Sequence, residues 1–127
     1  MESRRTRQQD AIEAVLADAG RPMSVQEVFS AAAATVPGIG LSTVYRTIRK
    51  LAEQGEIAAV AVPGQPDRYE LAHVAATHHH HFHCTACDRV FDIRGCVGGL
   101  DRLLPSGFEL HGHELTLVGA CDHCSGT

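Results

Sequence analysis

Two pairs of cysteines with Cys-x-x-Cys spacing are the most chemically specific feature of this chain: Cys84 with Cys87, and Cys121 with Cys124. Both thiolates of such a pair can bind one ion, and two pairs complete the tetrahedral four-sulfur shell of a structural zinc site. Redox-active dithiols or two local disulfides would use the same spacing. Neither pair begins a helix in a thioredoxin-like strand–helix–strand pattern, however. We therefore predict one closed structural Zn²⁺ site.

A run of histidines lies directly before the first pair, at residues 78–83 (HHHHFH). On a β-strand, successive side chains point to opposite faces of the sheet. One strand could therefore supply two separate metal sites: His79 and His81 on one face, and His78 and His80 on the other. A solvated polar run or a purification tag is the alternative, although a tag is normally terminal.

The possible metal ligands are concentrated in one part of the chain. All nine histidines and all five cysteines lie within residues 73–124, whereas residues 1–55 carry seven basic and six acidic side chains. A chain of 127 residues suffices for one ordinary domain or two small ones. We therefore place a domain boundary near residue 72.

The sequence contains no apolar run long enough to cross a membrane, and residues 1–9 lack the apolar segment of a signal peptide. We expect a cytoplasmic protein with no membrane partner. Disulfides are rare in that compartment, which again favours metal binding by the paired cysteines. Cys96, the fifth cysteine, is either a half-buried small residue or a soft ligand or redox-sensitive thiol.

The first half has the pattern of a winged helix-turn-helix. Apolar spacing predicts helices at residues 6–19 and 24–34, the second with a capping box from Ser24 to Glu27. A third helix, capped by Ser42 or Thr43, should end at Gly55. Residues 57–62 and 68–71 are predicted to form two short strands around a Pro-Gly turn.

The third helix would be the recognition helix of such a domain. Its exposed face should offer donors to DNA phosphates and base edges, namely Ser42, Thr43, Tyr45, Arg46, Arg49 and Lys50. A small helical domain with a solvated basic face explains the same residues equally well.

The second half is predicted to be a small α+β domain. Residues 89–93 continue the histidine strand, with Asp92 as a possible carboxylate ligand. A short helix should lie at residues 98–104, and two further strands at 108–111 and 114–118 return the chain to the first cysteine pair. The exposed edge of this sheet could pair with a second copy of the chain.

Taken together, these motifs resemble the ferric uptake regulator family of bacterial metal-sensing repressors. The resemblance covers nearly the whole chain and rests on residues 40–46 (GLSTVYR), residues 68–71 (RYEL), the histidine run and both cysteine pairs. It implies an α+β protein with a winged-helix DNA-binding domain (1–72), a hinge (73–77) and a metal-binding dimerisation domain (78–127). It also implies homodimers that bind AT-rich inverted repeats in double-stranded DNA when a regulatory metal is bound.

The resemblance also implies roles for individual residues. The four paired cysteines match the structural zinc ligands, and the regulatory site would use His73, His79 and His81. A further site in the dimerisation domain would use His78, His80 and His113, with Cys96 or Asp101 nearest the position of its usual acidic ligand. Tyr45 and Arg46 match DNA-contacting positions, and Arg4 or Arg5 could reach the minor groove.

The sequence departs from the family pattern at several positions that bear on the metal. Iron and peroxide sensors often have a histidine at the start of the second helix, where this chain has Pro22 and Met23. A mostly imidazole site favours zinc, since iron or manganese sites usually include more carboxylate. We therefore expect a zinc-sensing repressor of metal-homeostasis genes, with Fe²⁺ or Mn²⁺ and an iron or peroxide sensor as the alternative.

Two other classes of protein can be weighed against this expectation. A zinc hydrolase or deaminase would need an HExxH or HxE…PCxxC motif, and the sequence has neither, so we do not expect an enzyme. A zinc storage or chaperone protein would not need a recognition helix.

Overall fold

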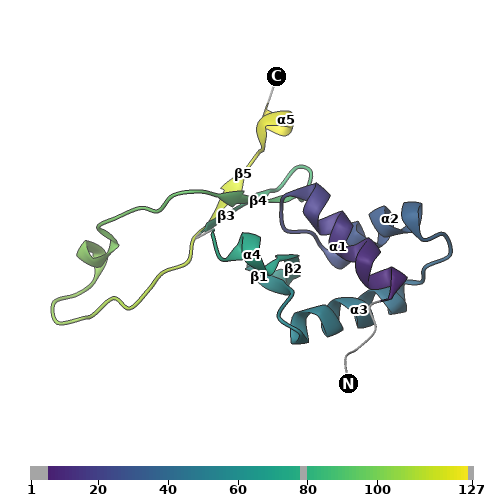
Figure 1. Ribbon diagram of the computed structural model, residues 1–127. Coiled ribbons are helices and arrows are strands. Elements are labelled where there is room, and N and C mark those ends of the chain that lie inside the picture. The colour runs from purple at the N-terminus through teal and green to yellow at the C-terminus, as the bar shows by residue number, and fades with distance from the viewer. Residues whose placement is uncertain (1–5, 78–79, 126–127) are drawn as a thin grey trace.

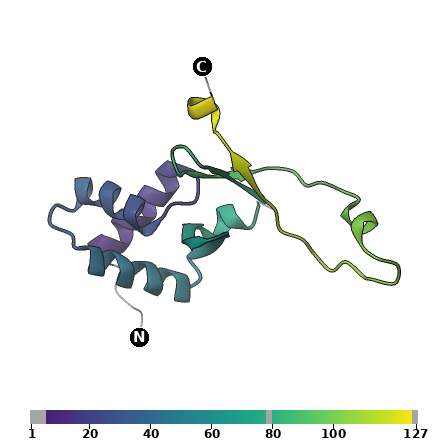
Figure 2. The ribbon, with the colours of Figure 1, turned by 180° about the vertical axis from the view of Figure 1, so that it is seen from behind.

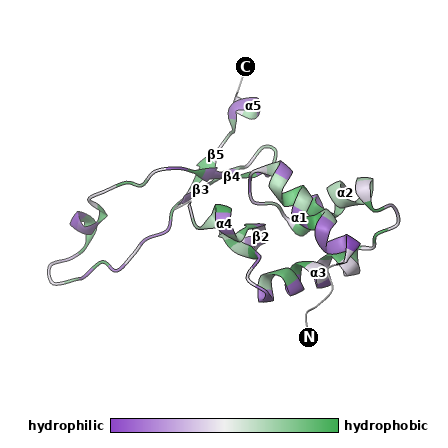
Figure 3. Ribbon diagram, viewed as in Figure 1, coloured by the Kyte–Doolittle hydropathy of each residue, from purple (hydrophilic) through white to green (hydrophobic). Residues whose placement is uncertain are grey.

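The computed structural model describes residues 6–77 and 80–125 (Figure 1). Three helices come first: α1 (Arg7–Ala19), α2 (Val25–Thr35) and α3 (Leu41–Glu53). They pack around an apolar core that includes Ile12, Val28, Val44 and Leu51, each almost fully buried. In Figure 3, hydrophobic and hydrophilic stretches alternate along α3, as expected for a helix with one face on this core. No described helix has the length and apolar character needed to cross a membrane.

A β-hairpin completes the first half. The strands β1 (Ile57–Val62) and β2 (Gln65–Leu71) pair antiparallel, with Ile57 opposite Leu71. Met23, before α2, exchanges two backbone hydrogen bonds of 2.8 Å with Tyr69, so the hairpin is fixed to the helices. Three helices followed by such a hairpin form a winged helix-turn-helix.

One detail of this half differs from the sequence-based prediction. The helix α3 begins at Leu41 with Gly40 as its N-cap, and no side chain caps it. The prediction of Ser42 or Thr43 as the cap was therefore wrong. The helix starts earlier because extended backbone at Gly40 already allows the first intrahelical bond, which leaves the Ser42 side chain exposed.

The second half is built on a three-stranded sheet. A short helix, α4 (Ala72–Ala75), occupies part of the predicted hinge and precedes β3 (His80–Cys84), β4 (Val90–Ile93) and β5 (Thr116–Gly119). The strand order is β4-β3-β5, with β3 antiparallel to β4 and parallel to β5. The helix α5 (Asp122–Ser125) follows. The chain is thus α+β, with a helical first half and a small sheet domain.

A long arm, residues 94–115, connects β4 to β5 and projects away from the rest of the chain (Figures 1 and 2). It contains one 3-10 turn, η1 (Leu100–Leu103), where a helix was predicted at 98–104. The predicted strand at 108–111 is wrong, because within the part of the chain that the structure describes no strand lies beside this segment to pair with it. Phe108 is 66% and Leu103 79% exposed, so the arm leaves large apolar side chains in water.

The capping box of α2 allows a direct test of local stability. Ser24 accepts a hydrogen bond from the Glu27 backbone N–H at 3.1 Å, and its own N–H donates to the Glu27 carboxylate at 3.0 Å. We expect Ser24→Ala to lower the free energy of unfolding by about 1 kcal/mol. Urea unfolding followed by circular dichroism measures this. Ser30→Ala, on the exposed face of the same helix, should be neutral or slightly stabilising; equal losses in both variants would contradict the capping role.

Candidate metal centres and nucleic-acid interface

The two cysteine pairs meet because β3 and β5 are parallel neighbours. Cys84 ends β3 opposite Gly119 on β5, and the Thr85 N–H donates to the Gly119 carbonyl at 2.8 Å. The four sulfur atoms of Cys84, Cys87, Cys121 and Cys124 lie within 4.8 Å of one another, and all four are free thiols. The Cys87 and Cys121 sulfurs are 3.8 Å apart, close to the ~3.8 Å separation of two sulfurs on a tetrahedral zinc with ~2.3 Å bonds.

The thiols of this four-thiol cluster differ in acidity. Backbone N–H groups of Cys87 and Cys121 donate to the Cys84 sulfur and lower its pKa to about 6. The pKa of Cys124 is raised to about 12, first by its hydrogen bond with Cys121 and then by that with Cys84. One sulfur is therefore readily ionised while another keeps its proton in the absence of a cation. Four sulfurs with no open position fit a structural zinc ion.

A second cluster lies where the hairpin faces the sheet. It consists of Glu70 on β2, His81 on β3 and Asp92 on β4, with ligand atoms within 4.8 Å of one another. His81 Nε2 is 3.2 Å from Asp92 Oδ1 and 3.8 Å from Glu70 Oε1. His81 is directly opposite Asp92 in the β3–β4 register. We call these three residues the carboxylate cluster; a cavity of about 200 Å³ beside it is also lined by Glu114.

Burial gives the carboxylate cluster unusual protonation. The pKa of Asp92 is raised to about 7, first by its burial and then by the hydrogen bond and negative charge of Glu70. The pKa of His81 is raised as well, chiefly by its hydrogen bond to Glu70. Asp92 and His81 thus hold protons that a divalent cation would displace, and the oxygen and nitrogen donors of the three side chains suit such a cation.

A third cluster joins β3 to the two ends of the arm. His80, Cys96 and His113 place their ligand atoms within 4.8 Å of one another, and we call them the thiol–imidazole cluster. Cys96 Sγ is 3.1 Å from His113 Nε2, and the His80 and His113 rings stack with centroids 5.0 Å apart. The backbone N–H of Leu115 donates to His80 Nδ1 at 3.2 Å and positions that ring.

The strand places His80 and His81 in different clusters, as the alternation of side chains requires. His73 is exposed on α4, and Asp101 is exposed on η1; among the described residues neither belongs to any of the three clusters. His78 and His79, like Arg4 and Arg5, lie outside the described residues. Glu70 was absent from the predicted ligand set, although its position two residues after Arg68 on β2 puts both side chains on one face of the hairpin.

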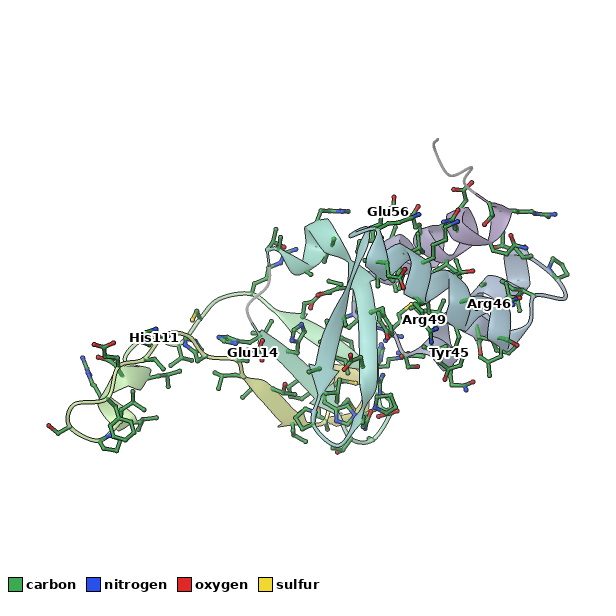
Figure 4. All side chains as sticks on the ribbon, turned by 90° about the horizontal axis from the view of Figure 1, so that it is seen from below. Tyr45, Arg46, Arg49, Glu56, His111 and Glu114 are labelled. Atoms are coloured by element: carbon green, nitrogen blue, oxygen red, sulfur yellow. The ribbon has the colours of Figure 1, made fainter. Side chains whose placement is uncertain are left out.

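The exposed face of α3 carries the side chains predicted to contact DNA. Figure 4 shows Tyr45, Arg46 and Arg49 together on this helix, away from the sheet domain. Tyr45 is 50% exposed although it is a large aromatic residue, and Arg46 donates to the Thr43 hydroxyl at 3.2 Å. Ser42 and Arg49 are exposed, while Thr43 and Lys50 are partly so. Aromatic, hydroxyl and guanidinium groups on one protruding helix suit a DNA groove.

A winged helix followed by a sheet domain with cysteine and histidine clusters is typical of metal-responsive transcriptional regulators. Residues 1–118 match the model of the ferric uptake regulator family. The ferric uptake regulation protein of Bacillus subtilis (strain 168) is 31% identical over 108 residues, covering 82% of this chain and 72% of that protein. The chain therefore belongs to the ferric uptake regulator family.

Members with different functions are similar to this chain. The peroxide operon regulator of Bacillus subtilis (strain 168) is 24% identical, over 94% of this chain and 83% of that protein. A solved structure described as a zinc-bound manganese uptake regulator is 28% identical, with a TM-score of 0.78, over 94% of this chain and 91% of that one. The family membership thus supports a regulator of metal uptake or of the peroxide response and leaves the metal open.

The protonation of Asp92 predicts how cation binding depends on pH. Below its pKa of about 7 the carboxyl holds a proton that a cation must displace. We expect the apparent affinity for Mn²⁺ to fall below pH 7 by about tenfold per pH unit for the Asp92 proton, and more steeply where His81, whose pKa is also raised, binds a second proton. This can be measured by titrating the zinc-loaded protein with Mn²⁺ at each pH and following the free Mn²⁺ by electron paramagnetic resonance. Asp92→Asn should bind Mn²⁺ more weakly and with a shallower pH dependence; a flat profile for the unchanged protein would contradict the assignment.

Proposed function

We propose that this protein is a metal-dependent DNA-binding repressor, with residues 1–72 binding DNA, 73–77 acting as the hinge and 78–127 forming the dimerisation domain. The observation that supports this is that the three residues of the carboxylate cluster come from both halves of the chain. Glu70 belongs to the hairpin of the winged helix, whereas His81 and Asp92 belong to the sheet domain. A cation bound by all three would link the two halves directly.

The chemistry of the cluster explains how a cation would act as a switch. Without it, two carboxyl groups face each other in a buried position, which is unfavourable when both are ionised. A divalent cation compensates both charges and favours the arrangement in which β2 lies against the sheet domain. Metal binding would therefore shift the population towards that arrangement. In a two-fold dimer, this fixes the spacing of the two α3 helices to match successive major grooves.

The DNA contacts follow from the exposed face of α3. Arg46, Arg49 and Lys50 would bind phosphates or base edges, with Ser42, Thr43 and Tyr45 as further donors. We propose an AT-rich inverted repeat as the operator, with Arg4 or Arg5 in the adjacent minor groove. A second copy of the chain would cover the apolar side chains that the arm and β5 expose, including Phe108, Leu117 and Val118.

The carboxylate cluster bears on the identity of the regulatory metal. The expectation of zinc rested on a ligand set of imidazoles, whereas the three assembled ligands include two carboxylates. Such donors favour Fe²⁺ or Mn²⁺ over a softer ion. We therefore propose an iron or manganese sensor, with zinc uptake regulation as the second candidate because Zn²⁺ also accepts carboxylate and imidazole ligands.

The thiol–imidazole cluster has a different donor set. One thiolate and two imidazoles suit Zn²⁺ better than Fe²⁺ or Mn²⁺. An ion held by His80, Cys96 and His113 would tie both ends of the arm to β3. We propose that this cluster binds a second zinc ion, so that zinc supports the sheet domain and the arm while another metal carries the signal.

The switch proposal predicts the effect of removing one imidazole. We expect His81→Ala to weaken metal-induced DNA binding about tenfold or more, since removing a residue that only positions a metal ligand already costs that much. The zinc of the four-thiol cluster should remain. Fluorescence anisotropy of an AT-rich palindrome, titrated with Mn²⁺, Fe²⁺ and Zn²⁺, measures the response. His111→Ala is the control, because His111 is exposed on the arm (Figure 4).

Two results would contradict this proposal. A His81→Ala variant that responds to metal in full would show that the carboxylate cluster is not the switch. An unchanged protein that binds metal without gaining DNA affinity would instead support a zinc storage or chaperone protein.

The donors of the thiol–imidazole cluster predict that Cys96, and not Asp101, binds the ion. Cys96→Ser should lower zinc content by one ion per chain and remove part of the thiolate charge-transfer absorption of the Co²⁺-substituted protein, because only a thiolate gives that band. Asp101→Asn should change neither, since Asp101 lies outside the cluster. The reverse result would assign the acidic residue as the ligand.

A further inference from the structure

The hairpin contacts the sheet domain at a second place, beside the carboxylate cluster. Arg68 and Glu70 are two residues apart on β2, so both point towards the sheet, and their exposed fractions are only 3% and 2%. Glu70 meets His81. Arg68 meets Asp88, with Nη2 3.1 Å from the Asp88 carboxylate and Nη1 donating to the Asp88 backbone carbonyl at 2.9 Å. A cation shared by Glu70 and His81 would strengthen the first contact, whereas the second is an ion pair that involves no cation ligand.

Asp88 is held in place from both sides. It directly follows Cys87, with φ of 64°, a left-handed conformation that aspartate tolerates better than most residues. Its carboxylate accepts a hydrogen bond from Gln65 on the hairpin at 3.2 Å and lies 2.7 Å from His83 Nε2 on β3. The turn of the first cysteine pair therefore presents a carboxylate to the winged helix in a fixed position.

Arg68 is in turn fixed to the helical core. Its Nη1 donates to Glu27 Oε1 at 3.1 Å, and the other oxygen of Glu27 accepts from Arg21 at 2.7 Å. Glu27 also completes the capping box of α2. A continuous set of charged contacts thus runs from the start of α2 through Arg68 to Asp88, so any movement of the turn relative to the helices has to break it.

We propose that Arg68 and Asp88 form a metal-independent latch that holds β2 at the distance from the sheet at which Glu70, His81 and Asp92 can share one cation. They are positioning residues and do not bind the cation themselves. The inference rests on the proposed function of the carboxylate cluster. When a binding-competent arrangement is only partly populated, the apparent dissociation constant rises by the inverse of that population. Breaking the latch should therefore weaken cation binding without removing any ligand.

The test uses the full-length, zinc-loaded protein and the substitution Asp88→Asn, which keeps the shape and the left-handed tolerance of the residue. We expect the apparent affinity for Mn²⁺ to fall about threefold to tenfold, since an exposed carboxylate paired with a buried arginine contributes modestly. DNA affinity at saturating Mn²⁺ should be unchanged, because the bound cation then holds the two halves. Asp122→Asn is the matched control: it makes the same change at an exposed position between the two cysteines of the other pair, on α5.

A second variant tests whether the two residues act together. Arg68→Gln should weaken Mn²⁺ binding, and adding Asp88→Asn to it should cause little further loss, because coupled residues are not additive. Additive losses, or an Mn²⁺ affinity in Asp88→Asn equal to that of the control, would overturn the latch.

If Asp88→Asn lost zinc, or lost DNA affinity at saturating Mn²⁺, Asp88 would have a general structural role. Either result would also overturn the latch. Failure of the proposed function would be recognised separately, because the His81→Ala variant would then still gain DNA affinity in full when metal is added.

Discussion

The sheet domain has almost no apolar core, and the four-thiol cluster stands in the place of one. Most of the buried apolar residues lie at or before Val62; beyond it, only Cys84, Val90 and Cys121 are buried apolar residues among those the structure describes. Two of these three are cluster members. A small domain that cannot bury enough apolar surface needs another source of cohesion, and a structural metal is the usual one. The cluster lies where β3 pairs with β5 and directly before the turn at Asp88, so an ion bound there would hold both together.

The structure concentrates its possible metal chemistry on one strand. In β3, neighbouring residues serve different clusters: His80 faces the arm, His81 faces the hairpin, and Cys84 ends the strand in the four-thiol cluster. The strand is central in the sheet, between β4 and β5, so its backbone is held on both edges. A rigid strand with alternating side chains can keep three ligand sets separate within five residues, which a flexible loop could not do.

Much of this arrangement could be predicted from local rules. The cysteine spacing and the capping box at Ser24 are short-range features that the geometry confirmed, and the described part of the histidine run places His80 and His81 in different clusters, as the predicted alternation requires. The pairing of Glu70 with His81 could not be predicted in the same way, because it depends on how closely the hairpin approaches the sheet across the turn at α4. The arm was misjudged for a related reason: a strand pattern at residues 108–111 has no effect without a neighbouring strand. Gly40 shows that a backbone conformation can replace the side-chain cap that the sequence suggested.

The exposed arm has a consequence for how such a protein would behave in a cell. Leu103, Phe108 and Val118 are each more than half exposed in the single chain, so isolated chains carry an unfavourable apolar surface that association would remove. The stability of a chain of this kind depends on its own concentration, since association stabilises by mass action. In the repressor proposed above, the abundance of the protein would then be a second signal beside the metal. A cell that makes more of it would obtain a regulator that assembles, and therefore responds, at a lower concentration of the cation.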